Sequence, residues 1–111
     1  MIRIGTAGFS YKDWEGPVYP VDKPAGFNPL AYLAGFFSCI EMNVSFYRVP
    51  EARSVEKWVR AVAREDFRFT FKLYRGLTHG NEDDALRPFL AALEPCREAG
   101  RLGAILLQFP Y

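Results

Sequence analysis

Residues Arg68-Phe69-Thr70-Phe71-Lys72-Leu73 alternate polar and apolar side chains, and this stretch decides the fold prediction. Successive side chains of a β-strand face opposite sides, so the stretch predicts a strand with one apolar face and one polar face. Residues 39–45 repeat the pattern, because apolar Ile40, Met42 and Val44 alternate with polar side chains. We expect the apolar sets to face a helix layer, which leaves the polar sets on the inner face of a barrel. These polar sets are Glu41, Asn43 and Ser45 in residues 39–45, and Arg68, Thr70 and Lys72 in residues 68–73.

Helix patterns separate the predicted strands. Asn28-Pro29 favours a helix start, with the asparagine as the cap and the proline in the first turn. Ser54 is expected to cap a second helix, whose apolar stripe is Val55, Trp58, Val59 and Val62. Residues 3–7 and 102–109 supply two further strands. Strand and helix therefore alternate along the chain, which is typical of parallel β/α folds.

The last predicted helix and strand lead to the end of the chain. Asp83 or Asp84 is expected to cap this helix, Pro95 to kink it and Gly100 to end it. Residues 102–109 are almost entirely apolar, as in strands that are buried on both faces. We predict an α/β fold, a TIM-barrel-like parallel half barrel of about four strands and three helices. Residues 1–111 would then form the amino-terminal half of one domain, with the second half absent.

The composition is that of a folded, cytoplasmic protein. Hydrophobic residues make up 50% of the 111, and 14 basic residues against 13 acidic ones give a net charge of +1. This balance indicates neither a nucleic acid nor a membrane surface as a partner, and no apolar run approaches the ~20 residues of a membrane span. Cys39 and Cys96 lack the spacing of a metal or redox motif, so we expect two buried thiols in a reducing compartment.

Candidate catalytic residues lie where the predicted strands end, because active sites of β/α barrels gather there. Glu41 is the candidate general acid or base, and Lys72 either lowers its pKa or binds an anionic group of a substrate. Alternatively, the two side chains form an internal ion pair. His79, in the loop after residue 73, has either a site role or an ordinary surface position. One histidine and one glutamate are too few ligands for a metal centre, and the residues name no cofactor.

Candidate binding residues surround these positions. Asn43 and Gln108 suit the hydroxyl or carbonyl groups of a small-molecule ligand, or they tie down loop backbone. Arg48 either clamps a phosphate or lies on the surface. The Gly5-x-x-Gly8 pair lacks the order of a phosphate loop, so we predict close backbone packing there. Five aromatic side chains in loops either floor a pocket for a sugar or base, or plug the barrel mouth: Tyr11, Trp14, Tyr19, Phe46 and Tyr47.

At these residues the sequence resembles the YecE-like family, known as domain of unknown function 72. The matching pieces are Gly5–Tyr11 with Trp14, Tyr19-Pro20, Glu41–Arg48, Phe71-Lys72, Thr78-His79 and Leu107–Pro110. The resemblance implies a complete β/α barrel about twice this length, of which this chain matches the amino-terminal half. Phe9 stands where the family usually has tryptophan, and Val44 stands where it usually has a hydroxyl residue. The family has no firmly assigned reaction.

Three hypotheses about function follow. The first is an enzyme acting on a small polar metabolite, such as a sugar or a phosphorylated compound, with Glu41 as acid or base. The second is a ligand-binding or interaction module without catalysis, and the third is a truncated chain without independent function. A half barrel exposes two strand edges and its inner face, so we expect self-association, which a well-dispersed amide spectrum from a monomer would contradict.

Overall fold

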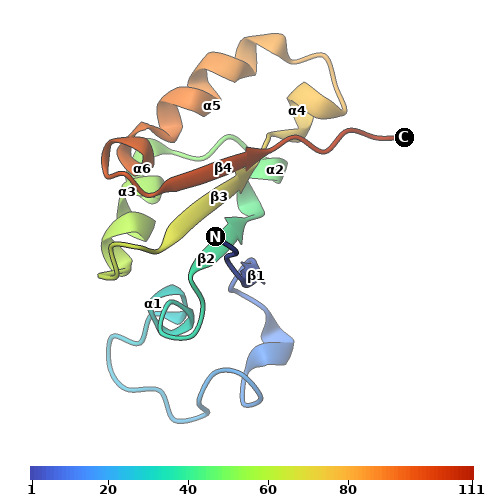
Figure 1. Ribbon diagram of the computed structural model, residues 1–111. Helices are drawn as coiled ribbons and strands as arrows, with labels where there is room; N and C mark the ends of the chain where they lie inside the picture. The colour runs from blue at the N-terminus through green and yellow to red at the C-terminus, as the bar shows by residue number, and fades with distance from the viewer.

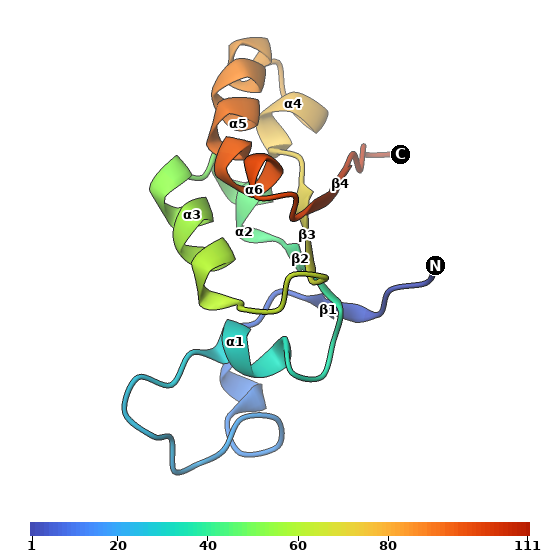
Figure 2. The same cartoon turned by 60° about the vertical axis from the view of Figure 1, so that its left-hand side comes forward.

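The computed structural model describes residues 1–111 and contains one four-stranded parallel sheet with helices along one of its faces (Figures 1 and 2). The strands are β1 (Gly5–Ala7), β2 (Cys39–Met42), β3 (Arg68–Lys72) and β4 (Leu102–Leu106). Figure 2 shows no helix over the opposite face, which we call the open face. The helices are α1 (Pro29–Leu33), α2 (Val44–Tyr47), α3 (Ala52–Ala61), α4 (Arg75–Thr78), α5 (Leu86–Ala92) and α6 (Glu94–Glu98).

The strands follow one another in the sheet in chain order, and each pair is parallel. Ala7, Glu41, Thr70 and Ala104 form one row across the four strands. Residues in one such row point to the same face of the sheet, and residues in the next row point to the other face. The register therefore determines which side chains face the helices and which lie on the open face. The predicted α/β class and parallel order are confirmed.

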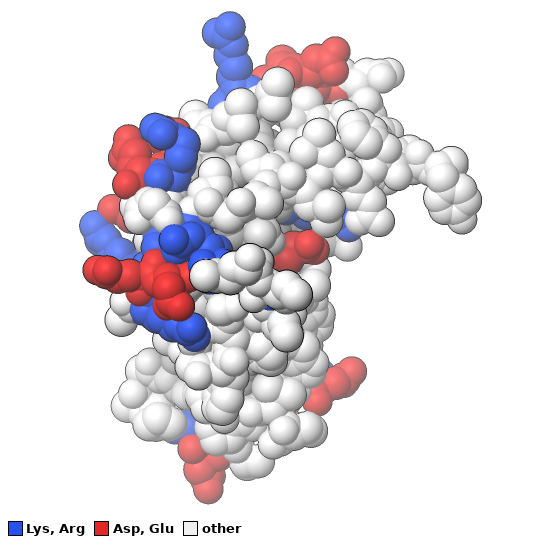
Figure 3. Space-filling view, viewed as in Figure 1, with Lys and Arg blue, Asp and Glu red and all other residues white.

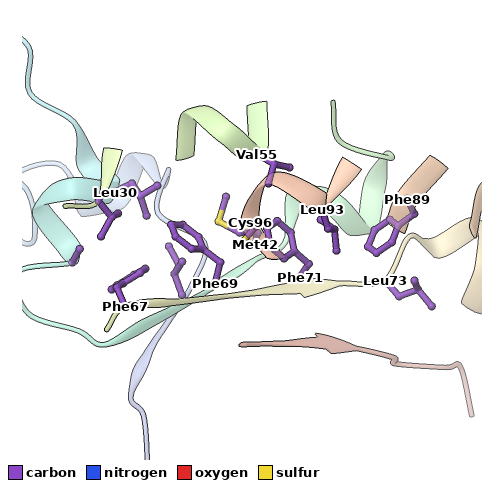
Figure 4. Packing of buried hydrophobic residues seen from close by; sticks show 13 residues of the cluster. Leu30, Met42, Val55, Phe67, Phe69, Phe71, Leu73, Phe89, Leu93 and Cys96 are labelled. Atoms are coloured by element: carbon purple, nitrogen blue, oxygen red, sulfur yellow. The ribbon is translucent and has the colours of Figure 1, made fainter. Parts of the chain in front are cut away.

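The core lies between the sheet and the helices. Figure 4 shows the apolar side chains of β3 pointing towards α3, α5 and α6, and Phe67, Phe69 and Phe71 are all fully buried. Val55 and Val62 of the predicted helix stripe are buried against them, and Trp58 and Val59 pack at the margin. Burying each large side chain contributes roughly 1.5–3 kcal/mol, so the alternation in residues 68–73 holds one face of the sheet to the helix layer.

The helix starts differ from the sequence predictions at two places. Asn28 caps α1 as expected, because its side-chain oxygen accepts a hydrogen bond from the Ala31 amide at 3.1 Å. Ser54 is not a cap, since α3 begins at Ala52 and the Ser54 amide already donates to the carbonyl of Glu51. Asp83 and Asp84 lie in a short 3-10 turn that makes no side-chain cap, and α5 begins after it.

The predicted kink at Pro95 is a complete break between two helices. The ring of Pro95 lies in the first turn of α6, where a missing amide hydrogen costs least. Phe89 and Leu93 are buried in the core, whereas Leu86 and Leu90 of the same segment are 44% and 46% exposed. Gly100 ends the segment with a φ of 69°, as predicted for a left-handed terminal residue.

β4 is shorter and more exposed than the sequence predicts. The apolar run to Phe109 predicts a strand buried on both faces, whereas β4 stops at Leu106 and lies at the edge of the sheet. Leu106, Leu107 and Phe109 are 41%, 55% and 59% exposed, because no neighbouring strand or second layer covers them. These three side chains therefore expose apolar surface to solvent.

Close backbone packing at β1 explains the first glycine. A side chain added at Gly5 would place its Cβ 1.9 Å from the carbonyl oxygen of Cys39, so only glycine fits beside β2.

The loop that follows β1 carries a chain of packed aromatic rings. The ring centroid of Trp14 lies 4.7 Å from that of Tyr11 and 6.0 Å from that of Tyr19. Trp14 is therefore held in an aromatic cluster with its loop neighbours.

Arg101 is a buried cation at the start of the last strand. Its guanidinium donates to the carbonyl oxygens of Phe67 at 2.9 Å and Val62 at 3.2 Å, and it lies 5.8 Å from the ring centroid of Phe69. Only 7% of the residue is exposed, and burial lowers the pKa of the guanidinium. The side chain therefore ties the start of β4 to the end of α3 and the start of β3.

Both cysteines are free. Cys96 is fully buried, and this burial raises the pKa of its thiol to about 11, so the thiol is protonated and unreactive at neutral pH. Cys39 is half-buried rather than buried as predicted.

None of the helices has the length and apolar character needed to cross a membrane.

Candidate functional site

Glu41 and Lys72 both point to the open face of the sheet. Glu41 pairs in register with Thr70, two residues before Lys72, while Met42 and Phe71 of the intervening row face the helices. The polar alternation therefore brings the two candidate catalytic side chains to one face of neighbouring strands. They do not form an ion pair, because all five ion pairs of the chain join other residues.

Lys72 is held by an aromatic ring instead of a carboxylate. Its ammonium nitrogen lies 4.5 Å from the ring centroid of Phe46, within the range of a cation–π contact. The side chain is only half-buried. The ammonium therefore keeps donor capacity for a further group.

Phe46 is the centre of a small cluster at the ends of β2 and β3. The ring of His79 meets it edge-on at 5.4 Å and 85°, and the ring of Tyr47 meets it at 5.2 Å and 85°. We call Phe46, Tyr47, Lys72 and His79 the ring cluster. Sequence reasoning assigned Phe46 no individual role, although its place between Ser45 and Tyr47, just after a predicted strand, could have indicated one.

A helical turn after β2 corrects two sequence predictions. The predicted strand over residues 39–45 ends at Met42, and Asn43 adopts helical backbone angles that begin α2. Val44 is therefore not part of the strand face. Ser45 does not face the barrel interior, since it is fully buried and its hydroxyl lies 2.8 Å from the carbonyl oxygen of Met42 and 2.6 Å from that of Lys72. Ser45 thus fixes the end of β2 to the end of β3.

His79 follows α4, a one-turn helix after β3. Its Nδ1 lies 2.7 Å from the hydroxyl of Thr78, which leaves Nε2 for another partner. The imidazole borders an open hollow of about 490 Å³, together with Arg75 and Asn81. Tyr74 and Glu82 also line this hollow, and the hydrogen bond to Glu82 raises the pKa of Tyr74. His79 is therefore accessible and lies beside the ring that supports Lys72.

Asn43 lies on another hollow, between β2, α3 and the loop after β1. The space measures about 290 Å³ and is lined mainly by apolar side chains. The side-chain oxygen of Asn43 is buried and has no hydrogen-bond partner. Asn43 therefore does not tie down loop backbone through this oxygen.

Three candidate binding residues lie apart from these features. Gln108 is exposed in the tail beyond β4. Arg48 is exposed and borders a small hollow of about 100 Å³ with Glu51 and Trp58. Trp14 belongs to the aromatic cluster of the first loop. The structure thus brings Glu41, Lys72, Tyr47 and His79 to the ends of β2 and β3, but it does not gather Gln108, Arg48 and Trp14 with them.

Five ion pairs join ten of the other charged side chains. Figure 3 shows charged side chains gathered over α3, α6 and the turn before β3, while much of the other visible surface is uncharged. On these segments Arg60 pairs with Glu56 and Arg97 with Glu94, and the bond to Arg64 lowers the pKa of Asp66. No group of three His, Cys, Asp or Glu residues is placed to hold a metal ion.

Comparisons with known proteins agree with the sequence resemblance. The UPF0759 protein YunF of Bacillus subtilis (strain 168) is 31% identical over 118 residues, which cover 99% of this chain and 40% of YunF. The UPF0759 protein YecE of Escherichia coli (strain K12) is 32% identical over 114 residues, covering 99% of this chain and 38% of YecE. The chain thus spans about two fifths of the length of these relatives.

Solved structures show the same fold. A crystal structure of a DUF72 family protein from Enterococcus faecalis superposes with a TM-score of 0.79 at 30% identity, covering 99% of this chain and 40% of that one. A second crystal structure of that protein gives a TM-score of 0.72 at 27% identity. The family described as "Protein of unknown function DUF72" matches residues 3–111. This match covers nearly the whole chain, so the chain belongs to the DUF72 family.

Proposed function

We propose that the chain supplies the amino-terminal half of a parallel β/α barrel that binds a small anionic metabolite at its strand ends. Lys72 is the anion contact and Glu41 is the acid or base. The observation that carries this proposal is the ammonium of Lys72, which rests on the ring of Phe46 and has no carboxylate partner. An unpaired, half-buried cation beside an accessible histidine suits a phosphate or carboxylate group.

The half-barrel part of the proposal rests on the open face and on the relatives. Eight parallel strands make a barrel whose interior is just filled by side chains, and this chain has four strands in sequential order. The relatives have more than twice its length, which leaves room for a second set of strands. The open face would then be the barrel interior, and self-association of the chain alone through this face is part of the same proposal.

Replacing Lys72 with alanine should weaken the binding of inorganic phosphate and of glucose 6-phosphate by about tenfold or more. The reason is that a hydrogen bond to a charged group contributes about 1.5–3 kcal/mol. Isothermal titration calorimetry of the 111-residue chain measures the change. Lys57→Ala is the matched control, since it removes the same charge from the exposed side of α3. Equal losses in the two variants, or no phosphate binding to the native chain, would rule out Lys72 as the anion contact.

The acid–base role of Glu41 needs the complete barrel. In a barrel completed by the remaining three fifths of a relative, Glu41→Gln should preserve folding and phosphate affinity while turnover falls by at least a hundredfold, as for the loss of a general acid or base. Phosphorus NMR of sugar phosphates incubated with the barrel reports product. Turnover that survives the substitution would remove Glu41 from the mechanism. Tight binding with no product from the unaltered barrel would favour a binding module.

A further inference from the structure

The two outer strands of the sheet, β1 and β4, each have one edge without a neighbouring strand. An edge strand presents a row of unpaired backbone N–H and C=O groups, which can bind another strand. All strand pairs of the sheet are parallel, so the free edge of β1 and the free edge of β4 are unlike. The β1 edge of a second copy can therefore extend the sheet beyond β4 in the same parallel order.

Exposed apolar side chains lie beside both free edges. Ile4, directly before β1, is 69% exposed, and Leu107, directly after β4, is 55% exposed. The carbonyl oxygen of Ile4 accepts a hydrogen bond from the amide of Ser38 at 3.2 Å. At the other edge, the carbonyl oxygen of Leu106 accepts one from the amide of Leu73 at 2.9 Å. The ladders to the inner strands thus continue to these places, and apolar surface is exposed where the next strand would lie.

Ile4 and Leu107 belong to the same side of the sheet. Ile4 is two residues before Thr6, whose register partner Ile40 is buried against the helices. Leu107 is two residues after Ile105, which packs against the core between the sheet and the helices. Side chains two residues apart along a strand point to the same face. When β4 of one copy pairs with β1 of another, the two apolar side chains therefore lie on one side of the joint.

We propose that two copies of the chain pair edge to edge, β4 of each with β1 of the other, and close an eight-stranded parallel barrel around a two-fold axis. Contacts between unlike surfaces form a closed ring where the rotation between copies returns to its start. Each copy supplies four strands in sequential order, half of such a barrel, so two copies complete the ring. Pairing like edges, β1 with β1 or β4 with β4, would leave two edges and both open faces in solvent.

Closure places the open faces of both copies around one lumen. Glu41 and Lys72 lie on the open face, so the lumen would hold both residues from each copy. The inference rests on the half-barrel part of the proposed function. It adds the partner, a second copy, and the contact, a pair of parallel strand edges.

The test uses two edge variants, Ile4→Glu and Leu107→Lys, with Leu90→Lys as the matched control. Leu90 is 46% exposed on α5, in the helix layer rather than on a strand. Sedimentation equilibrium measures the mass of each 111-residue chain, and circular dichroism checks its folding. The native chain and Leu90→Lys should be dimers. The dissociation constant of each edge variant should rise about a hundredfold or more, because a charge loses water at both joints.

An equimolar mixture of Ile4→Glu and Leu107→Lys separates edge pairing from other modes of association. A mixed dimer has one native joint, and at its other joint the introduced glutamate and lysine attract each other. Its dissociation constant should therefore return to within about tenfold of the native value. Native mass spectrometry identifies the mixed dimer, because the two variants differ in mass.

Four results would each overturn the proposal: a monomeric native chain, assemblies larger than two copies, a dimer that persists in either edge variant alone, or a mixture that stays monomeric. Phosphate binding at Lys72 is measured separately. A failed mixture leaves the phosphate site standing, and a chain that binds no phosphate leaves the edge pairing standing.

Discussion

Replacing Phe71 with alanine should lower the free energy of unfolding by about 3–5 kcal/mol, the cost of emptying a filled core position. Phe71 is fully buried on the helix side of β3, and its ring centroid lies 6.5 Å from that of Trp58 on α3. The truncation would leave a cavity between the sheet and the helices. Urea unfolding followed by circular dichroism measures the loss.

Thr70→Ala is the matched control for this experiment, because it changes the neighbouring position on the opposite face of the same strand. Thr70 is half-buried, and its hydroxyl donates one hydrogen bond of 3.2 Å to the carbonyl oxygen of Ile40. Its removal should cost about 1 kcal/mol. Similar losses for the two variants would mean that the two faces of β3 are equally important to packing, contrary to the one-sided sheet.

Arg101→Met should lower the free energy of unfolding by about 2–4 kcal/mol. Methionine fills a similar length but donates no hydrogen bonds, so the carbonyl oxygen of Val62 would lose its Arg101 donor and that of Phe67 would keep only the guanidinium of Arg68 as a side-chain donor. Arg97→Met is the control, since Arg97 is exposed and pairs only with Glu94 at the surface. Thermal unfolding of both variants makes the comparison. The interpretation of Arg101 as a structural tie is wrong if both variants unfold at the same temperature as the native chain.

The strand faces could be predicted from the sequence, but the ends of the strands could not. Alternation in residues 39–42 and 68–73 has only one arrangement that buries the apolar set. Beyond Met42 the alternation continues to Ser45, yet the backbone turns, because Phe46 and Arg48 donate local hydrogen bonds to Asn43 and Val44. Local bonding there overrides the strand pattern, and no residue type marks the change.

The candidate site was predicted only in part, for a similar reason. Strand register placed Glu41 and Lys72 on one face, which is a consequence of the period of two. The partner of Lys72 depends on where the ring of Phe46 points after the turn, and that direction follows from the turn itself. The burial of Arg101 was also missed, since a charged residue after a helix-ending glycine is usually exposed.

The most direct test of the account is a phosphate titration of the 111-residue chain, labelled with ¹⁵N and followed by amide NMR. We expect concerted shifts at Phe46, Lys72 and His79, which lie in different elements and meet only at the ends of β2 and β3. These shifts should disappear in Lys72→Ala and persist in Lys57→Ala. Shifts confined to α3 and α6, or none at all, would contradict a ligand site at the strand ends.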